Sequence, residues 1–408
     1  MQKLPRFSAL RYTGFRRFWI GLLASVLGFQ MMLIAQGWLI YDLTGSKLYL
    51  GYVGLASGLP AIALNLFGGV IADKVDQRRL LVITQSFSGS VMFVLATLVL
   101  LDMVQVWHVM ISAFLIGSVQ AFDGPTRQAM FPHLIDRKDM MNAVALNSMV
   151  WQGTRVIGPA LGGIIIGTQL GVSPGYYAAF FGFVVMAFLV STLHLPSIQR
   201  PQSTSLFADM VVGLMFVKSN SLFGFLIGMT FFNSIFGMSY VFLLPVFARD
   251  IFEMGTRGLG FLSSAGGVGA VLGTLVAASL GDFRRKGYLL LGGGVCFGIF
   301  LILFALVSSV MISFHLALCL MFMAGFSTSL YMISVMSTLQ TSVPDELRGR
   351  VMGIYGMTWS LLPLGAMSSG AIAEYTSAPV AVGVGGTAVA IFALGIGIGS
   401  KQVRDLSQ

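Results

Sequence analysis

Long apolar stretches separated by short polar segments dominate the hydrophobic pattern of this 408-residue chain. Each stretch holds about 20 residues, enough for an α-helix to cross the roughly 30 Å hydrocarbon core of a bilayer. Twelve such spans are predicted, near 18–41, 49–72, 80–102, 106–126, 143–168, 175–195, 222–246, 258–281, 288–309, 311–338, 351–375 and 379–400. The pattern therefore predicts an all-α integral membrane protein with twelve transmembrane helices.

The longest polar segment divides these spans into six and six. We predict an N-terminal six-helix bundle over 1–195, a cytoplasmic linker over 196–221 and a C-terminal six-helix bundle over 222–408. Apolar residues recur at helical spacing in the linker, at Phe207, Met210, Val211 and Leu214. This spacing favours a helix lying on the membrane surface over a separate ligand-binding domain.

The two halves of the chain resemble each other. Span two ends in a charged segment with Gly69, Asp73, Lys74, Arg78 and Arg79, and span eight ends in one with Gly281, Asp282, Arg284, Arg285 and Lys286. An offset of 207 residues also aligns Gly365 and Gly370 with Gly158 and Gly163. A repeated six-span unit predicts two bundles about a pseudo-twofold axis, with a substrate site between them near the bilayer midplane.

The distribution of charge sets the orientation. Only 10% of the residues are charged, against about 25% in soluble domains, and the net charge is +9. With the N-terminus inside, 20 of the 24 Lys and Arg residues fall on the cytoplasmic side and three on the other; Arg155 alone lies inside a span. This bias predicts cytoplasmic termini and explains the basic character by orientation and anionic lipid, not by nucleic-acid binding.

The sequence holds no set of residues typical of an enzyme. It has no Walker loop or serine nucleophile elbow, and its four histidines lack metal-ligand spacing. Cys296 and Cys319 lie in apolar segments, where a thiol is ordinarily a small packing residue. We therefore expect no cofactor, no metal and no enzymatic activity, and an energy source other than ATP.

The charged segment after span two is similar to the signature of the major facilitator superfamily. That signature has a glycine, an acid, a basic residue and an arginine-rich turn, and Gly69, Asp73, Lys74, Arg78 and Arg79 match it. Asp76 and Gln77 depart from it. An acid at 76 resembles the branch of enterobactin-type siderophore exporters and macrolide efflux proteins, as do the segments TGSKLYLGYVGLASGLPAIAL, FDGPTRQAMFPHL and VPDELRGRVMG.

The resemblance implies a conformational latch on the cytoplasmic side. Asp73 would sit beside the N-terminus of span eleven, whose helix dipole favours an acid. The alternative is that Lys74, Arg78 and Arg79 only keep the loop inside. The resemblance also implies that Asp123, a costly carboxylate within span four, pairs with Arg78. A permanent salt bridge and a bridge that breaks during the cycle both remain open.

Span five carries a second motif, GPxxGG. Arg155 precedes Gly158, Pro159, Gly162 and Gly163, and this run resembles the motif typical of antiporters in the superfamily. It implies export over import, although ordinary close packing of helices would also use such glycines. A cation inside a span should face the bundle interior. Arg155 is therefore expected to bind an anionic substrate or to pair with an acid of the cavity.

The fold implied by the resemblance gives a list of residues expected to line the substrate cavity: Gln30, Gln36, Gln120, Asn233, Tyr240 and Tyr331. Each could equally bridge two helices. Proton coupling is also expected, yet no carboxylate lies plainly at the midplane. Asp42 and Glu374 fall at outer ends of spans and Asp123 lies nearer the inner face.

Together these features predict a secondary active transporter, expected to be a monomer in a bacterial cytoplasmic (inner) membrane. It would export a small amphipathic or aromatic molecule of drug or siderophore type by alternating access, in exchange for protons. Three alternatives remain: a proton-coupled importer of the same fold, a non-transporting sensor or scaffold, and an integral-membrane enzyme.

Overall fold

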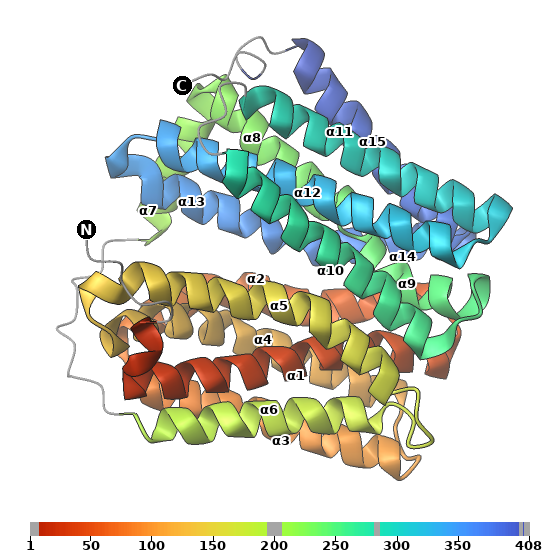
Figure 1. Ribbon diagram of the computed structural model, residues 1–408, viewed down its shortest axis with the longest axis horizontal. Helices are drawn as coiled ribbons and strands as arrows, with labels where there is room; N and C mark the ends of the chain where they lie inside the picture. The colour runs from red at the N-terminus through yellow and green to blue at the C-terminus, as the bar shows by residue number, and fades with distance from the viewer. Residues whose placement is uncertain (1–7, 194–205, 281–285, 400–402, 404–408) are drawn as a thin grey trace. The chain divides into compact units, whose positions relative to one another are not determined.

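The structure is a computed structural model that describes residues 8–193, 206–280, 286–399 and 403; within helices, the side chains at 65–74, 206–211, 213, 286, 345, 346 and 396 are outside the description. The regular elements of this part are helices, as predicted (Figure 1). The α-helices are α1 Thr13–Thr44, α2 Lys47–Lys74, α3 Gln77–Leu100, α4 Val106–Met130, α5 Met140–Ile165, α6 Ser173–Ser191, α7 Leu206–Ser219, α8 Ser221–Phe232, α9 Tyr240–Val246, α10 Gly255–Leu280, α11 Lys286–Leu306, α12 Phe314–Ser342, α13 Asp345–Trp359, α14 Leu362–Tyr375 and α15 Ala378–Gly399.

Ten helical stretches among the described residues are long and apolar enough to cross a membrane. The helices α5 and α13 with α14, which correspond to predicted spans five and eleven, are not among them. Asn142, Asn147, Gln152 and Arg155 lower the hydropathy of α5. The protein is therefore a multi-pass helical membrane protein, and the number of twelve spans stays a prediction.

The contacts divide the chain into two compact units, the first made of Met1–Leu43 and Leu59–Ser203. A buried cluster joins α1, α3, α5 and α6 through Phe15, Phe18, Leu22, Leu81, Leu146, Met186 and Val190. Small residues bring α1 against α6, because a Cβ added at Gly28 would lie 2.8 Å from the Cα of Ala179. The core of this unit thus depends on close backbone approach as well as on side-chain volume.

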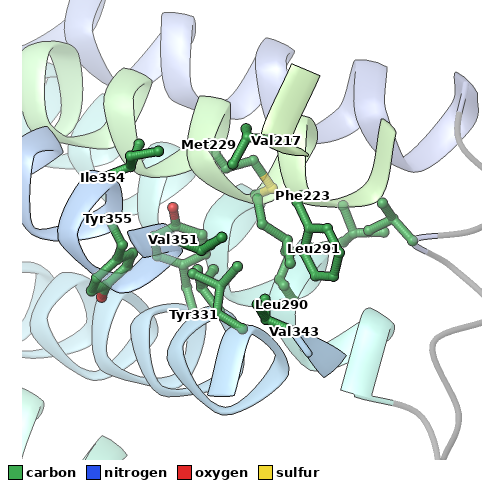
Figure 2. Close-up of a cluster of buried hydrophobic side chains, with 14 of the residues drawn as sticks. Val217, Phe223, Met229, Leu290, Leu291, Tyr331, Val343, Val351, Ile354 and Tyr355 are labelled. Carbon is green, nitrogen blue, oxygen red and sulfur yellow. The ribbon is translucent and has the colours of Figure 1, made fainter. Parts of the chain in front are cut away.

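The second unit is made of Thr44–Gly58 and Thr204–Gln408. Figure 2 shows a buried cluster of this unit, which includes Val217 of α7, Phe223 and Met229 of α8, Leu290 and Leu291 of α11, Tyr331 of α12, and Val351, Ile354 and Tyr355 of α13. The predicted linker helix is present as α7, and it contributes to this core at its C-terminal end.

Two predicted spans are interrupted. Span seven continues to Ile251 and contains two π-helical turns, Asn233–Gly237 and Phe247–Ile251. Span eleven was predicted as one helix over 351–375, which is wrong: α13 ends at Trp359 and α14 begins at Leu362. Pro363 stands at the start of α14, where its missing N–H and fixed φ favour a new helix.

The N-terminal half of α2 packs within the second unit, whereas the sequence boundary placed it in the first. A Cβ added at Gly51 would lie 2.9 Å from the Cα of Met367, and one at Gly54 would lie 2.7 Å from the Cβ of Ala366. The carboxylate of Glu374 accepts hydrogen bonds from the amides of Lys47 and Leu48, at 2.7 and 3.2 Å. Glu374 therefore caps the first turn of α2. The sequence alone placed this residue only at the outer end of a span.

Candidate functional site

A buried ion pair lies in the membrane-spanning part of the first unit. Oδ2 of Asp123 accepts a hydrogen bond from Nε of Arg127, 2.5 Å away and one turn further along α4. The side chains are 4% and 10% exposed. Taking both charges out of water is costly unless further hydrogen bonds satisfy the remaining polar atoms.

Those further bonds come from α1 and α3. Oδ1 of Asp123 accepts from Nε2 of Gln85 at 2.6 Å and from Oγ1 of Thr84 at 3.2 Å. Nη2 of Arg127 donates to Oγ of Ser25 at 2.7 Å, and that hydroxyl donates to Oε1 of Gln85 at 3.0 Å. Asp123, Arg127, Ser25 and Gln85 thus form a closed ring that ties three helices together.

The ring has one unsatisfied donor. Nη1 of Arg127 is buried and has no hydrogen-bond partner. A buried N–H on a charged group costs free energy while it stays unpaired. The guanidinium is therefore ready to take another acceptor if the carboxylate of Asp123 becomes protonated and its charge is lost.

The expected pairing of Asp123 with Arg78 is not found. Nη1 of Arg78 donates instead to the carbonyl of Leu193, at 2.8 Å, beyond the end of α6. Predicted span four ended at 126, whereas α4 continues to Met130, so Arg127 lies on the same helix as Asp123. The four-residue spacing of Asp123 and Arg127, which places both on one helix face, was the signal that could have identified the pair.

The predicted latch lies partly outside the description. Gly69, Asp73 and Lys74 belong to α2, but their side chains are not described, nor is the segment 281–285 that holds Asp282. Asp76 is the N-cap of α3: it accepts from the amide of Arg79 at 3.1 Å. The departure from the family pattern at this position therefore has a local structural role.

Gln77, the second departure, is buried, and its Oε1 has no hydrogen-bond partner. It lies on the first turn of α3, directly after the cap. A neutral amide at this position leaves an acceptor unsatisfied.

The glycines of the GPxxGG motif on α5 face α1. A Cβ added at Gly158 would lie 2.5 Å from the Cβ of Gln30, and one at Gly162 would lie 3.4 Å from the Cα of Met31. Pro159 and Gly163 are also buried. The motif has a packing role, and Gln30, an expected cavity residue, forms part of that contact.

Arg155 precedes this contact and is exposed. Its guanidinium forms no ion pair among the described residues. The expected roles, binding an anionic substrate or pairing with a cavity acid, both stay predictions.

Two of the other expected cavity residues meet in the second unit. Asn233 and Tyr331 line a small cavity of about 10 Å³ together with Met229, Phe232, Gly294, Val389, Phe392 and Ala393. Asn233 is 2% exposed, and neither its Oδ1 nor its Nδ2 has a hydrogen-bond partner. This residue begins a π-helical turn, a feature often found at functional sites.

The remaining candidates come from three different helices. Gln36 of α1 is buried, Gln120 of α4 is partly buried, and Tyr240 of α9 packs near Phe297 with ring centroids 6.5 Å apart. A role for them in a substrate cavity stays a prediction.

A cluster near the N-terminus was missed by the sequence analysis. Oγ of Ser8 donates to Oδ1 of Asp139, and the hydroxyl of Tyr12 donates to Asp136 and to Asp139 at 2.9 Å each. The amide of Ala9 donates to Oδ1 of Asn142 at 3.1 Å. The segment before α1 is thereby fastened to the start of α5, a link that no local sequence pattern indicates.

These bonds change the acidity of the groups involved. The hydrogen bond from Ser8, followed by that from Tyr12, lowers the pKa of the Asp139 carboxyl from its ordinary value of 3.8. Desolvation and the two aspartates raise the pKa of Tyr12. Asp139 therefore stays ionised and Tyr12 protonated near neutral pH.

Solved structures first define the class. The nucleoside transporter NupG has a TM-score of 0.74 at 15% identity over 94% of this chain and 98% of that one. A bacterial homolog of the human lysosomal transporter Spinster, in an inward-facing and unoccupied conformation, has a TM-score of 0.72 at 12% identity over 96% and 95%. At this level of identity the likeness shows that the chain shares its fold with these two transporters.

The family follows from the sequence. The sequence model of the family described as "Transmembrane secretion effector" matches residues 5–404, and the chain belongs to this branch of the major facilitator superfamily.

Its curated relatives include the staphyloferrin A transporter of Staphylococcus aureus (strain NCTC 8325 / PS 47), 26% identical over 82% of this chain and 83% of that protein. The multidrug efflux pump Tap of Mycolicibacterium fortuitum is 26% identical over 85% and 86%, and the enterobactin exporter EntS of Escherichia coli O139:H28 (strain E24377A / ETEC) is 24% identical over 84% and 81%.

Proposed function

We propose that the protein exports a small amphipathic or aromatic molecule, of the drug or siderophore type, across the bacterial cytoplasmic membrane by alternating access in exchange for protons. Membership of a secretion family over residues 5–404 supports the direction of transport, as do relatives named as an efflux pump and an exporter. The substrate class rests on the same relatives.

We further propose that the chain crosses the membrane twelve times and has both termini in the cytoplasm. The 26 residues of α5 would extend about 39 Å, longer than the bilayer core is thick, so its polar residues do not prevent it from spanning. The 20 to 3 division of basic residues supports the orientation.

Asp123 is the proposed site of proton coupling. Among the acidic side chains that the structure describes, it is the one buried within a candidate span; Asp42 and Glu374 are exposed. This is the single observation that carries the proton-coupled mechanism. A proton bound at Oδ2 would remove the charge that holds Arg127.

The consequence would reach three helices. When Asp123 is protonated, Arg127 has no counter-ion in the ring and its free Nη1 can bind a new acceptor. Ser25 on α1 and Gln85 on α3 then exchange partners, because each is bonded to a member of the pair. Binding and release of one proton would thus change how α1, α3 and α4 are tied together, which is the kind of bistable element that alternating access needs.

Accumulation of a fluorescent drug in living cells tests this function. Cells that express the protein should hold less dye than cells without it, and an uncoupler should abolish the difference. Asp123→Asn should abolish export, whereas Asp102→Asn, an exposed carboxylate in the connection between α3 and α4, should not. Asp102 has a positive φ of 54°, which asparagine tolerates, so this control preserves the backbone.

Greater accumulation in expressing cells would instead identify an importer. Normal export by Asp123→Asn would refute proton coupling at this residue while leaving the direction of transport intact.

A further inference from the structure

A groove of about 350 Å³ lies between α3 and α4, away from the buried ion pair. Each helix contributes five residues at the same spacing: Ser90, Val91, Val94, Leu95 and Leu98 from α3, and Trp107, His108, Ile111, Ser112 and Leu115 from α4. The two helices are consecutive and antiparallel in the first unit (Figure 1). Gln85 and Thr84 tie α3 to Asp123 at one end of the pair, and the groove opens toward the other end.

Apart from Nε2 of His108 at the rim, the walls of the groove offer no free polar group. Oγ of Ser90 donates to the carbonyl of Ser86 at 3.0 Å, and Oγ of Ser112 donates to the carbonyl of Val109 at 2.8 Å. Nε1 of Trp107 donates to Oε1 of Gln105 at 2.6 Å. A water molecule needs two to four polar partners to be held, and these walls do not supply them.

The groove is open to the surroundings of the helix pair. Val94 is 56% exposed, Trp107 54% and Ile111 49%. Both α3 and α4 are candidate membrane spans, so the medium that meets this surface is lipid. If the groove were empty, the side chains of its walls would lose dispersion contacts on one side. Water does not replace those contacts, because the apolar walls offer it too few hydrogen-bond partners. A hydrocarbon chain is the occupant that satisfies both conditions.

The rim adds a polar contact. Nδ1 of His108 accepts from the amide of Gln105 at 3.0 Å, which assigns the hydrogen of the neutral ring to Nε2. The indole of Trp107 lies beside this imidazole, with ring centroids 3.7 Å apart. Aromatic residues of this kind sit at the level of lipid headgroups. Nε2 can donate there to an ester or phosphate oxygen.

We propose that the α3–α4 groove is a phospholipid site, with one acyl chain between the helices and the headgroup at His108. On the topology predicted from charge, the connection 101–105 lies on the external side, so the lipid belongs to the outer leaflet. The bound chain fills the space between the two helices that carry Gln85 and Asp123. This site is separate from the transport step proposed above, and only its assignment to the outer leaflet rests on the orientation proposed there.

A photoactivatable phospholipid, with a diazirine in its acyl chain, tests the site. The purified full-length protein is reconstituted with it and illuminated, and the labelled residues are mapped by mass spectrometry. Labelling should concentrate on 90–98 and 107–115. Ile111→Trp fills the groove and should lower this labelling roughly tenfold. Ile391→Trp, the same change at an exposed position of α15, should leave it unchanged.

Two further variants separate a specific site from general solvation by lipid. Ser90→Phe fills the groove from the opposite helix and should have the effect of Ile111→Trp. His108→Phe keeps the ring but removes the donor, and should weaken labelling by the phospholipid more than labelling by an uncharged diazirine hydrocarbon. Even labelling of all exposed apolar residues, such as Phe181 and Phe188 of α6, would overturn the proposal. Loss of labelling when a transported dye is added would also overturn it, because the groove would then hold substrate.

Discussion

Replacing Arg127 by methionine tests the buried ring directly. Methionine keeps the apolar stem of the side chain but removes the charge and all three donor nitrogens of the guanidinium. Oδ2 of Asp123 loses its partner at 2.5 Å, and Ser25 loses the donor at 2.7 Å. The carboxylate remains 4% exposed, with Gln85 and Thr84 on its other oxygen.

The magnitude follows from burial. Removing one member of a buried ion pair costs about 3–5 kcal/mol, because an uncompensated charge stays out of water. We expect Arg127→Met to lower the free energy of unfolding by about this amount at neutral pH. Adding Asp123→Asn should recover much of the loss, since asparagine carries no charge and its carbonyl still accepts from Gln85. The coupling energy between the two positions should be about 1–3 kcal/mol.

Reversible unfolding by a denaturing detergent in mixed micelles measures both numbers. Arg79→Met is the matched control, because Arg79 pairs with Asp76 at 3.6 Å with side chains 81% and 52% exposed. Such a surface pair contributes at most about 1 kcal/mol. Equal small losses for the two methionine variants, or additive effects of Asp123→Asn and Arg127→Met, would refute the assignment of a buried, coupled ring.

Three further outcomes follow from the structure. Gly158→Ala should destabilise the protein by about 1–3 kcal/mol because the new methyl group meets Gln30. Gly153→Ala on the same helix, where no atom lies within 4 Å of the added Cβ, should be neutral or stabilising. Unfolding of both variants checks this, and equal effects would contradict the packing role. Asn233→Leu removes an unpaired buried amide, so it should raise the free energy of unfolding by about 1–3 kcal/mol and should reduce transport. Met229→Leu in the same cavity should change neither stability nor transport by much. Normal transport by Asn233→Leu would exclude a substrate role for the amide. Because the pKa of Asp139 is lowered in the folded state, its stabilisation is fully present above 3.8 and is lost as the pH falls from there through the lower folded value. Ser8→Ala should raise the folded pKa towards 3.8, so that in an acid titration this loss of stability is smaller and ends at a higher pH than in the unchanged protein. An unchanged profile would argue against the Ser8 bond as the main cause of the lowered pKa.

The helical class and most spans could be predicted because lipid leaves few alternatives to a helix, and a run of about 20 apolar residues is visible without any tertiary information. The predictions of helix ends were wrong where contacts between helices, and not local hydropathy, determine where a helix stops. Arg127 lay just beyond the predicted end of span four at 126, yet Asp123 and Ser25 hold it inside α4. The break between α13 and α14 was missed because residues 351–375, on both sides of it, look like one hydrophobic run. Pro363, which stands at the start of α14, was the local signal for a new helix.

The candidate site could be predicted only in part. Asp123 was identified because an acid inside a span is rare, but its partners Ser25 and Gln85 come from other helices and look like ordinary polar residues in the sequence. Asn233 and Tyr331 were named separately, and only the fold shows that they line one cavity although they are 98 residues apart in the chain. The link between Ser8 and Asp139 joins positions 131 residues apart and has no sequence signal.

Proton-driven export is tested most directly in inside-out membrane vesicles, which present the cytoplasmic face to the medium. A fluorescent lipophilic cation and a catecholate siderophore serve as probes, and a proton gradient, acid inside, is imposed. Vesicles with the protein should take up at least one probe only while the gradient lasts, and vesicles with Asp123→Asn should not. Uptake that is indifferent to the gradient, or release of preloaded probe when the gradient is imposed, would contradict proton-coupled export.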